Sequence, residues 1–144
     1  MPKKYRVFLD TSAILAGLNS PTGAAGVILA ACFAKQILAI ISPQVIEEAE
    51  RNIPKKFPKM TPAWQSFLLI PPEVTPRPTF QQVRRAYKIL PTSDAPTLAA
   101  ALEARPDVLI TWNPNHFFQP QVIKAVSFPI FLPGVFLNNY LKNE

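Results

Sequence analysis

The stretch that decides the fold lies near the N-terminus and reads Val7-Phe8-Leu9-Asp10-Thr11-Ser12-Ala13-Ile14-Leu15. It opens with β-branched, aromatic and aliphatic residues, as in a buried strand, and this run ends abruptly in an aspartate. Hydroxyl residues and helix-forming apolar residues follow. The pattern therefore predicts a strand that delivers Asp10 to the carboxyl edge of a sheet, where ligands of open α/β sheets bind. Asp10 could equally be only the N-cap of the following helix, because Asp, Ser and Thr are all good caps.

The rest of the chain alternates between strand-like and helix-like patterns. Apolar runs over 37–41, 107–111 and 128–132 have the length of strands, and the last is expected at a sheet edge because it contains a proline. Helical patterns cover 11–18, 24–34, 44–52, 63–70, 80–90, 94–102, 120–125 and 135–141. We therefore expect residues 1–144 to form a single α/β domain, with three α/β/α layers around a parallel sheet of about four or five strands.

The charge and the composition limit the classes of partner and of site. A formal net charge of +6 and an isoelectric point near 9.7 favour a polyanionic partner, without distinguishing RNA, DNA and an acidic protein. The chain has one cysteine, Cys32, and one histidine, which excludes a zinc site of cysteines and histidines within one chain and suits a reducing cytosol. Asp10 interrupts any signal-peptide core, and Lys35 breaks the apolar stretch 24–41. We therefore expect a cytoplasmic protein without a membrane span.

The middle of the chain combines proline, positive charge and aromatic rings. Seven of the 17 prolines lie between residues 53 and 79, a density that restricts the region to short elements. Lysines and arginines between residues 55 and 88 are interleaved with aromatic residues, a combination that fits a nucleic-acid backbone and unstacked bases. The RNA contacts expected on this pattern are Lys55, Lys56, Arg84 and Arg85. The alternative is a solvated basic face beside ordinary core aromatics.

Four polar residues stand where strands end or helices begin. Asp10 and Asn113 come just after the carboxyl ends of predicted strands. Glu48 lies on the helix after the second strand, and Asp94 opens a helix. If the first strand and the strand at 107–111 are neighbours, all four residues face one cleft. Clustered carboxylates repel one another, and an oxygen-loving divalent cation, Mg²⁺ or Mn²⁺, is the usual resolution. Such sites hydrolyse phosphodiesters by activating water and stabilising the leaving oxygen.

These residues, at this spacing, resemble the PIN-domain ribonucleases, a family that includes the toxins of toxin–antitoxin pairs. The family opens on a strand that ends in Asp-Thr-Ser or Asp-Thr-Asn, and Asp10-Thr11-Ser12 matches this motif. The second acid of the family is a Glu about six residues after a Ser that opens a helix. Ser42 and Glu48 fit this spacing.

The third and fourth motifs of the family also have counterparts, in the right order. An Asp opens a helix rich in Ala and Leu, as Asp94 does here. An apolar strand then leads to Thr, any residue, Asp or Asn, and a few residues later Phe, a pattern that 108–117 follows. The resemblance extends over nearly the whole chain, from Arg6 to about Leu132.

The resemblance implies a metal-dependent endoribonuclease that cleaves single-stranded RNA. The catalytic residues that it assigns are Asp10, Glu48, Asp94 and Asn113. The first three would hold Mg²⁺ or Mn²⁺, and Ser12 and Thr111 would support the site through hydrogen bonds. Glu47 is an alternative to Glu48, because the spacing separates the two poorly. A homodimer and a cognate antitoxin are implied by the resemblance alone.

Asn113 departs from the aspartate that often stands at the fourth position of the family. Its amide oxygen can ligate a metal or orient water, but a negative charge is lost, so a second metal should bind more weakly. An alternative function is therefore a weakly active or inactive protein of the same fold that binds RNA or a partner protein. His116 is expected to pack or hydrogen-bond locally beside the fourth motif rather than to act in catalysis.

Overall fold

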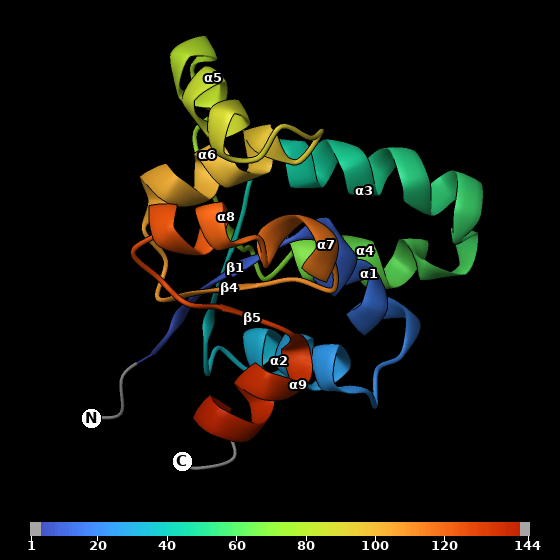
Figure 1. Cartoon of the computed structure of the whole chain (residues 1–144). Helices are drawn as coiled ribbons and strands as arrows, with labels where there is room; N and C mark the ends of the chain where they lie inside the picture. The colour runs from blue at the N-terminus through green and yellow to red at the C-terminus, as the bar shows by residue number, and fades with distance from the viewer. Residues whose placement is uncertain (1–3, 142–144) are drawn as a thin grey trace.

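A parallel sheet of five strands lies at the centre of the computed structural model, which describes residues 4–141. The strands are β1 (Arg6–Leu9), β2 (Leu38–Ile41), β3 (Glu73–Val74), β4 (Val108–Ile110) and β5 (Ile130–Phe131). They lie in the order β3-β2-β1-β4-β5, and every neighbouring pair is parallel (Figure 1). The predicted parallel α/β sheet is confirmed. Strands β1 and β4 are neighbours, which is the condition for their carboxyl ends to form one site.

Alternate side chains of the central strand enter two separate hydrophobic clusters. Val7 and Leu9 belong to one cluster and Phe8 to the other, because successive side chains of a strand point to opposite faces. The first cluster receives side chains from α1 (Thr11–Asn19), α2 (Ala24–Phe33), α3 (Pro43–Lys56), α4 (Thr61–Leu68) and α9 (Pro133–Phe136). The second receives them from α5 (Phe80–Ile89), α6 (Ala95–Ala104), α7 (Pro114–Phe117) and α8 (Pro120–Ala125). Helices therefore cover both faces of the sheet, as expected.

Most predicted elements form within about two residues of the predicted bounds. Helix α3 continues to Lys56, past Pro54, because a proline in the last turn removes only one backbone donor and Phe57 N–H still closes the helix on the carbonyl of Ile53 at 2.8 Å. A 3₁₀ turn, η1 (Pro58–Met60), separates α3 from α4. The predicted closing helix becomes α9 followed by a π-helical turn, η2 (Leu137–Leu141).

Two short elements, β3 and α7, were not predicted. Both residues of β3 are exposed, so the strand carries no hydrophobic alternation that a sequence pattern could detect. It exists because its backbone pairs with β2, with Ile41 opposite Val74. Helix α7 is a single turn within the fourth motif, and only Phe117 of its residues is buried.

Glycines allow close packing where α1 meets α2 and where α2 meets the loop that precedes it. A Cβ atom at Gly26 would lie 2.3 Å from the carbonyl oxygen of Pro21, and one at Gly17 would lie 2.6 Å from Cδ1 of Leu29. The two helices are bent by 95° relative to each other. Only a residue without a side chain fits at these two positions.

Within residues 4–141, no single helix is long and apolar enough to cross a membrane. Helices α1 and α2 reach the required length and composition only when they are taken together across their bend.

Candidate active site

The register between β1 and β4 sets the level of the site. Leu9 lies opposite Ile110, and the next N–H, that of Asp10, donates to the carbonyl oxygen of Ile110 at 3.1 Å. Asp10 and Thr111 are therefore the first residues beyond two adjacent central strands. Both are buried, with Asp10 4% exposed.

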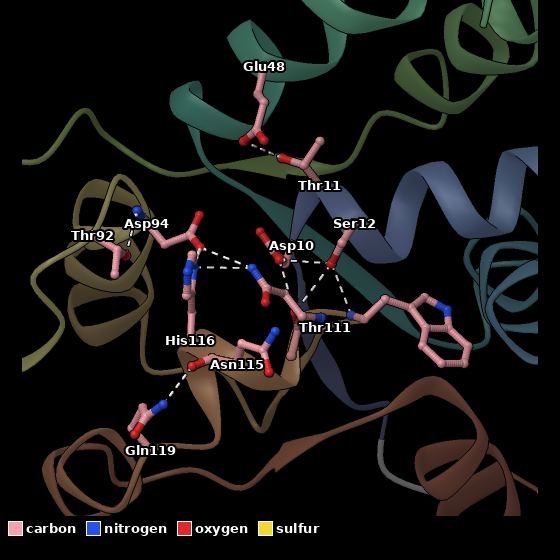
Figure 2. A network of polar contacts seen from close by, with 12 residues as sticks. Asp10, Thr11, Ser12, Glu48, Thr92, Asp94, Thr111, Asn115, His116 and Gln119 are labelled. Carbon is pink, nitrogen blue, oxygen red and sulfur yellow. Dashed lines mark hydrogen bonds and ion pairs between the residues drawn. The ribbon is translucent and has the colours of Figure 1, made fainter. Parts of the chain in front are cut away.

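Asp10 is the centre of a network of hydroxyl groups (Figure 2). Its Oδ2 accepts hydrogen bonds from Thr111 Oγ1 at 2.9 Å and from Ser12 Oγ at 2.9 Å, and the two hydroxyl oxygens lie 3.2 Å apart. The Asp10 side chain makes no cap hydrogen bond to α1, although the residue stands at the N-cap position. The alternative that Asp10 is only a helix cap is thus excluded by its hydrogen bonds.

The loop after β4 is tied to the same hydroxyls. The N–H of Trp112 donates to Ser12 Oγ at 2.9 Å, and the N–H of Asn113 donates to Thr111 Oγ1 at 2.9 Å. The side chains predicted to support the site therefore hold both Asp10 and the backbone of the fourth motif. Their placement explains why small hydroxyl residues stand at these positions.

Asp94 is a second carboxylate of the site. It stands at the start of α6 without making a side-chain cap hydrogen bond, and its own N–H donates to Thr92 Oγ1 at 3.1 Å. Its Oδ2 accepts a hydrogen bond from Asn113 Nδ2 at 3.3 Å and contacts Nδ1 of His116, which also lies 3.1 Å from Asn113 Nδ2. The third and fourth sequence motifs thus meet through Asp94, Asn113 and His116 (Figure 2).

The electrostatics of the site are those of two carboxylates in a small space. The pKa of Asp10 is raised from its ordinary value of 3.8 to about 6, chiefly by burial and also by the negative charge of Asp94. Hydrogen bonds from Ser12, Thr111 and the backbone of Thr11 oppose this rise without cancelling it. The fold therefore holds Asp10 and Asp94 close together at a cost to its own stability.

Glu48 and its neighbour Glu47 point to different surroundings. Oε2 of Glu48 accepts a hydrogen bond from Thr11 Oγ1 at 3.1 Å, next to Asp10 in the chain. Glu47 instead forms an exposed ion pair with Arg77. Of the two acids, Glu48 is the one beside the site. Among the described residues, however, no three His, Cys, Asp or Glu side chains are close enough together to hold one metal ion.

The residues predicted to contact RNA lie outside this network. Lys55 and Lys56 are exposed in the last turn of α3, and Arg84 and Arg85 are exposed on α5. The guanidinium of Arg84 lies 5.9 Å from the centre of the Phe80 ring, so one helix face combines a cation and an exposed aromatic ring. The four cations belong to two helices, α3 and α5, that lie apart in Figure 1.

The contact between His116 and Asp94 was not foreseen. A local hydrogen bond was expected, and the contact with Asn113, three residues away, is local. The contact with Asp94 spans 22 residues and depends on the packing of α7 against the start of α6. No spacing within the sequence signals it.

The parallel sheet, with carboxylates at its carboxyl edge, defines an α/β protein with a candidate ligand site at the usual place. A comparison with protein families is more specific. The PIN domain family matches residues 6–115, so the chain belongs to the PIN domain family. Members of this family are generally nucleases.

Solved structures give the same fold. The crystal structure of PAE2754 from Pyrobaculum aerophilum matches with a TM-score of 0.62 and 16% identity, covering 97% of this chain and 91% of that chain. At this identity the likeness concerns the fold alone. A comparison with curated proteins finds no match.

PIN domains typically use divalent metal ions, and carboxylate and amide oxygens, as at this site, are ligands that such ions take. Mg²⁺ commonly binds one or two carboxylates and keeps several waters. Asp10 and Asp94 provide two carboxylates whose mutual repulsion a cation would relieve, and the Asn113 side chain adds an amide oxygen. Of the three predicted metal ligands, Asp10, Glu48 and Asp94, Glu48 is the one that accepts a hydrogen bond from Thr11, beside the site.

Proposed function

We propose that the chain is a metal-dependent endoribonuclease that hydrolyses phosphodiester bonds of single-stranded RNA. The observation that supports this most is that two carboxylates, Asp10 and Asp94, lie close enough to repel each other. Asp10 precedes α1 and Asp94 precedes α6, but neither side chain makes a cap hydrogen bond to its helix. Carboxylates held together at the ligand-binding edge of a parallel sheet are typical of cation sites for phosphodiester chemistry.

In this mechanism the residues of the chain would bind the cation and orient its ligands. Asp10 and Asp94 would hold a divalent cation, Mg²⁺ or Mn²⁺. When bound, such an ion supplies an activated water and stabilises the leaving oxygen. Ser12 and Thr111 hold Asp10 from two different elements, so the carboxylate cannot turn without breaking a hydrogen bond. A carboxylate held in this way would keep its place relative to the scissile phosphate, and such positioning contributes to the rate.

Glu48 and Asn113 would act from the periphery. The hydrogen bond that Glu48 accepts from Thr11 holds it beside the site, and Glu48 would add a third negative charge that helps to hold the cation. Asn113 donates to Asp94 and so holds the second carboxylate in place. Because Asn113 is neutral, we expect one tightly bound cation rather than two.

The substrate is proposed from charge. A net charge of +6 favours a polyanion, and the exposed pairs Lys55–Lys56 and Arg84–Arg85 are the proposed contacts to its phosphates. Because these pairs lie on separate helices, each should contribute independently, and removing one pair should weaken binding mainly at low salt.

A second function has one specific observation in its favour. Asn113 and His116 both engage Asp94, so a cation must compete with them for this carboxylate. If Asn113 and His116 bind Asp94 more strongly than a cation does, the chain is a PIN-domain protein that binds RNA without cutting it.

One experiment separates the two functions. A labelled single-stranded RNA is incubated with Mn²⁺, Mg²⁺ or EDTA and with the wild type, Asp10→Asn or Glu103→Gln, an exposed acid at the other end of α6 from Asp94. The enzyme hypothesis predicts metal-dependent cutting that persists in Glu103→Gln and is lost in Asp10→Asn. Retarded migration of intact RNA by all three proteins, with no cutting in any metal, would establish the binding protein instead.

We further propose a cytoplasmic toxin of a toxin–antitoxin pair, acting as a homodimer with an antitoxin as its partner. The family resemblance supports this role, rather than any single residue. Induction of the wild type in a bacterial host should arrest growth, whereas Asp10→Asn should not, and the molar mass in solution tests the dimer. Normal growth on induction of an active nuclease would refute the toxin role alone.

A further inference from the structure

An exposed tryptophan stands within the site. Trp112 lies between Thr111 and Asn113, and its backbone N–H donates to the same Ser12 hydroxyl that donates to Asp10. Only two hydrogen bonds, each of 2.9 Å, therefore connect the Trp112 backbone to the Asp10 carboxylate. The flanking N–H of Asn113 is also bonded, to Thr111. The base of the Trp112 side chain is fixed to the site and cannot swing away with its loop.

The indole of Trp112 is 48% exposed and has no ring contact or hydrogen bond among the described residues. The second tryptophan of the chain, Trp64, is instead buried and fully engaged by its neighbours. Trp64 is 3% exposed, stacks on Phe67 with 5.9 Å between ring centres, and donates its Nε1–H to Glu50 at 3.3 Å. A large aromatic side chain that is left open beside a site has apolar surface available for a ligand.

We propose that Trp112 is a stacking platform for an unpaired base of the RNA next to the scissile phosphate. This inference rests on the proposed function, because it takes RNA as the substrate of the same site. The Trp112 backbone is joined to the Asp10 carboxylate through Ser12, so we expect a base next to a phosphate bound over Asp10 to reach the indole. Every base has a π-face, so stacking on tryptophan tolerates any sequence.

Stacking on Trp112 would also make the protein selective for single strands. The bases of a double helix are already stacked on each other and paired, so they cannot present a face to a side chain on the protein surface. An unpaired base can. Trp112 would thus select the strandedness of the substrate, while Asp10 and Asp94 serve the phosphate. A base stacked on tryptophan changes affinity by about tenfold.

The chain has two tryptophans, so replacing either one leaves the fluorescence of the other as a single signal. Trp64→Phe leaves Trp112 as the only fluorescent indole, and Trp112→Phe leaves only the buried Trp64. A short single-stranded oligouridylate is titrated into each protein in EDTA, so that binding is observed without cleavage. We expect quenching in the wild type and in Trp64→Phe, none in Trp112→Phe, and none in any protein with a duplex of the same length.

Affinity provides the second readout. Trp112→Ala should weaken binding of the oligouridylate by about tenfold, and Trp112→Phe, which keeps a ring, should recover most of the loss. Leu69→Ala is the matched control: it removes an 82% exposed apolar side chain on the segment that leads into the amino end of β3, at the opposite edge of the sheet. Its affinity should equal that of the wild type.

Different results would refute the stacking platform and the nuclease proposal. RNA binding with no Trp112 response and an unchanged affinity of Trp112→Ala would overturn the stacking platform, even in an active nuclease. An absence of RNA binding by the wild type would overturn it as well. If quenching occurs but no metal supports cutting, the stacking platform stands and the nuclease proposal fails.

Discussion

Replacing Asp10 by asparagine should stabilise the folded chain at neutral pH while abolishing nuclease activity. Asparagine has nearly the shape of aspartate but carries no charge at any pH. The substitution therefore removes the buried charge and its repulsion from Asp94 without creating a cavity.

The size of the effect follows from the pKa of Asp10. The gap between 3.8 in the unfolded chain and about 6 in the fold corresponds, at roughly 1.36 kcal/mol per pH unit, to about 3 kcal/mol. The pKa of Asp10 is higher in the folded chain than in the unfolded chain, so the folded wild type is more stable by this amount when Asp10 is protonated. This contribution to the free energy of unfolding is fully present below pH 3.8 and is lost as the pH rises through about 6. Asp10→Asn does not titrate, so its advantage over the wild type should grow by about 3 kcal/mol between acid and neutral pH.

Urea denaturation without divalent cations measures this difference. The free energies of unfolding of the wild type, Asp10→Asn and Glu103→Gln are compared below about pH 4 and near pH 7. Comparing the two pH values cancels any fixed cost of fitting the amide into the network of Ser12 and Thr111. Glu103→Gln, at an exposed position, controls for the loss of one carboxylate. An advantage of Asp10→Asn that is the same at both pH values would refute the reasoning.

A bound cation should stabilise the wild type but not Asp10→Asn, because only the wild type keeps the Asp10 carboxylate. An ion that binds only the folded chain stabilises it by about 2.7 kcal/mol at a concentration of about 100 times its dissociation constant. Adding Mn²⁺ near pH 7 should therefore raise the unfolding free energy of the wild type and leave Asp10→Asn unchanged. Equal stabilisation of the two proteins would place the ion elsewhere on the chain.

Further predictions concern the frame of the site. Thr111→Val removes a buried hydroxyl that donates to Asp10, so it should cost about 1–3 kcal/mol and lower kcat, as denaturation and single-turnover cleavage would reveal. Gly26→Ala places a Cβ against backbone atoms and should cost about 1–3 kcal/mol, whereas Gly134→Ala meets nothing within 4 Å and should leave the melting temperature nearly unchanged. Ser42→Ala removes the cap of α3 and should cost about 1 kcal/mol, and an unchanged melting temperature would contradict the cap.

The fold was predictable because its signals are local. The strand before Asp10, the capped and proline-opened start of α3 at Ser42, and the alternation of strands and helices can each be recognised within about ten residues. The prediction failed where no such signal exists. Strand β3 consists of two exposed residues, and its existence depends on a backbone neighbour that comes more than thirty positions earlier.

The site was predictable to the level of motifs and no further. The motifs identified Asp10 and Asp94, and the network around them includes Ser12 and Thr111 as expected. They could not separate Glu48 from Glu47, because adjacent helical residues differ only in the direction in which they point. In the fold, one contacts Thr11 and the other Arg77. The metal-binding role of Glu48 remains a prediction, as do the roles of the surface cations.

The hydrogen bond between Thr111 and Asp10 joins residues 101 positions apart. A ribosome therefore makes the carboxylate early and adds a hundred more residues before the hydroxyl that fixes it exists. Strand β4, the neighbour of β1, is made equally late. During translation the growing chain carries its acid without a working site. If the chain is the ribonuclease proposed above, it cannot cut its own messenger RNA until the end of β4 has left the exit tunnel.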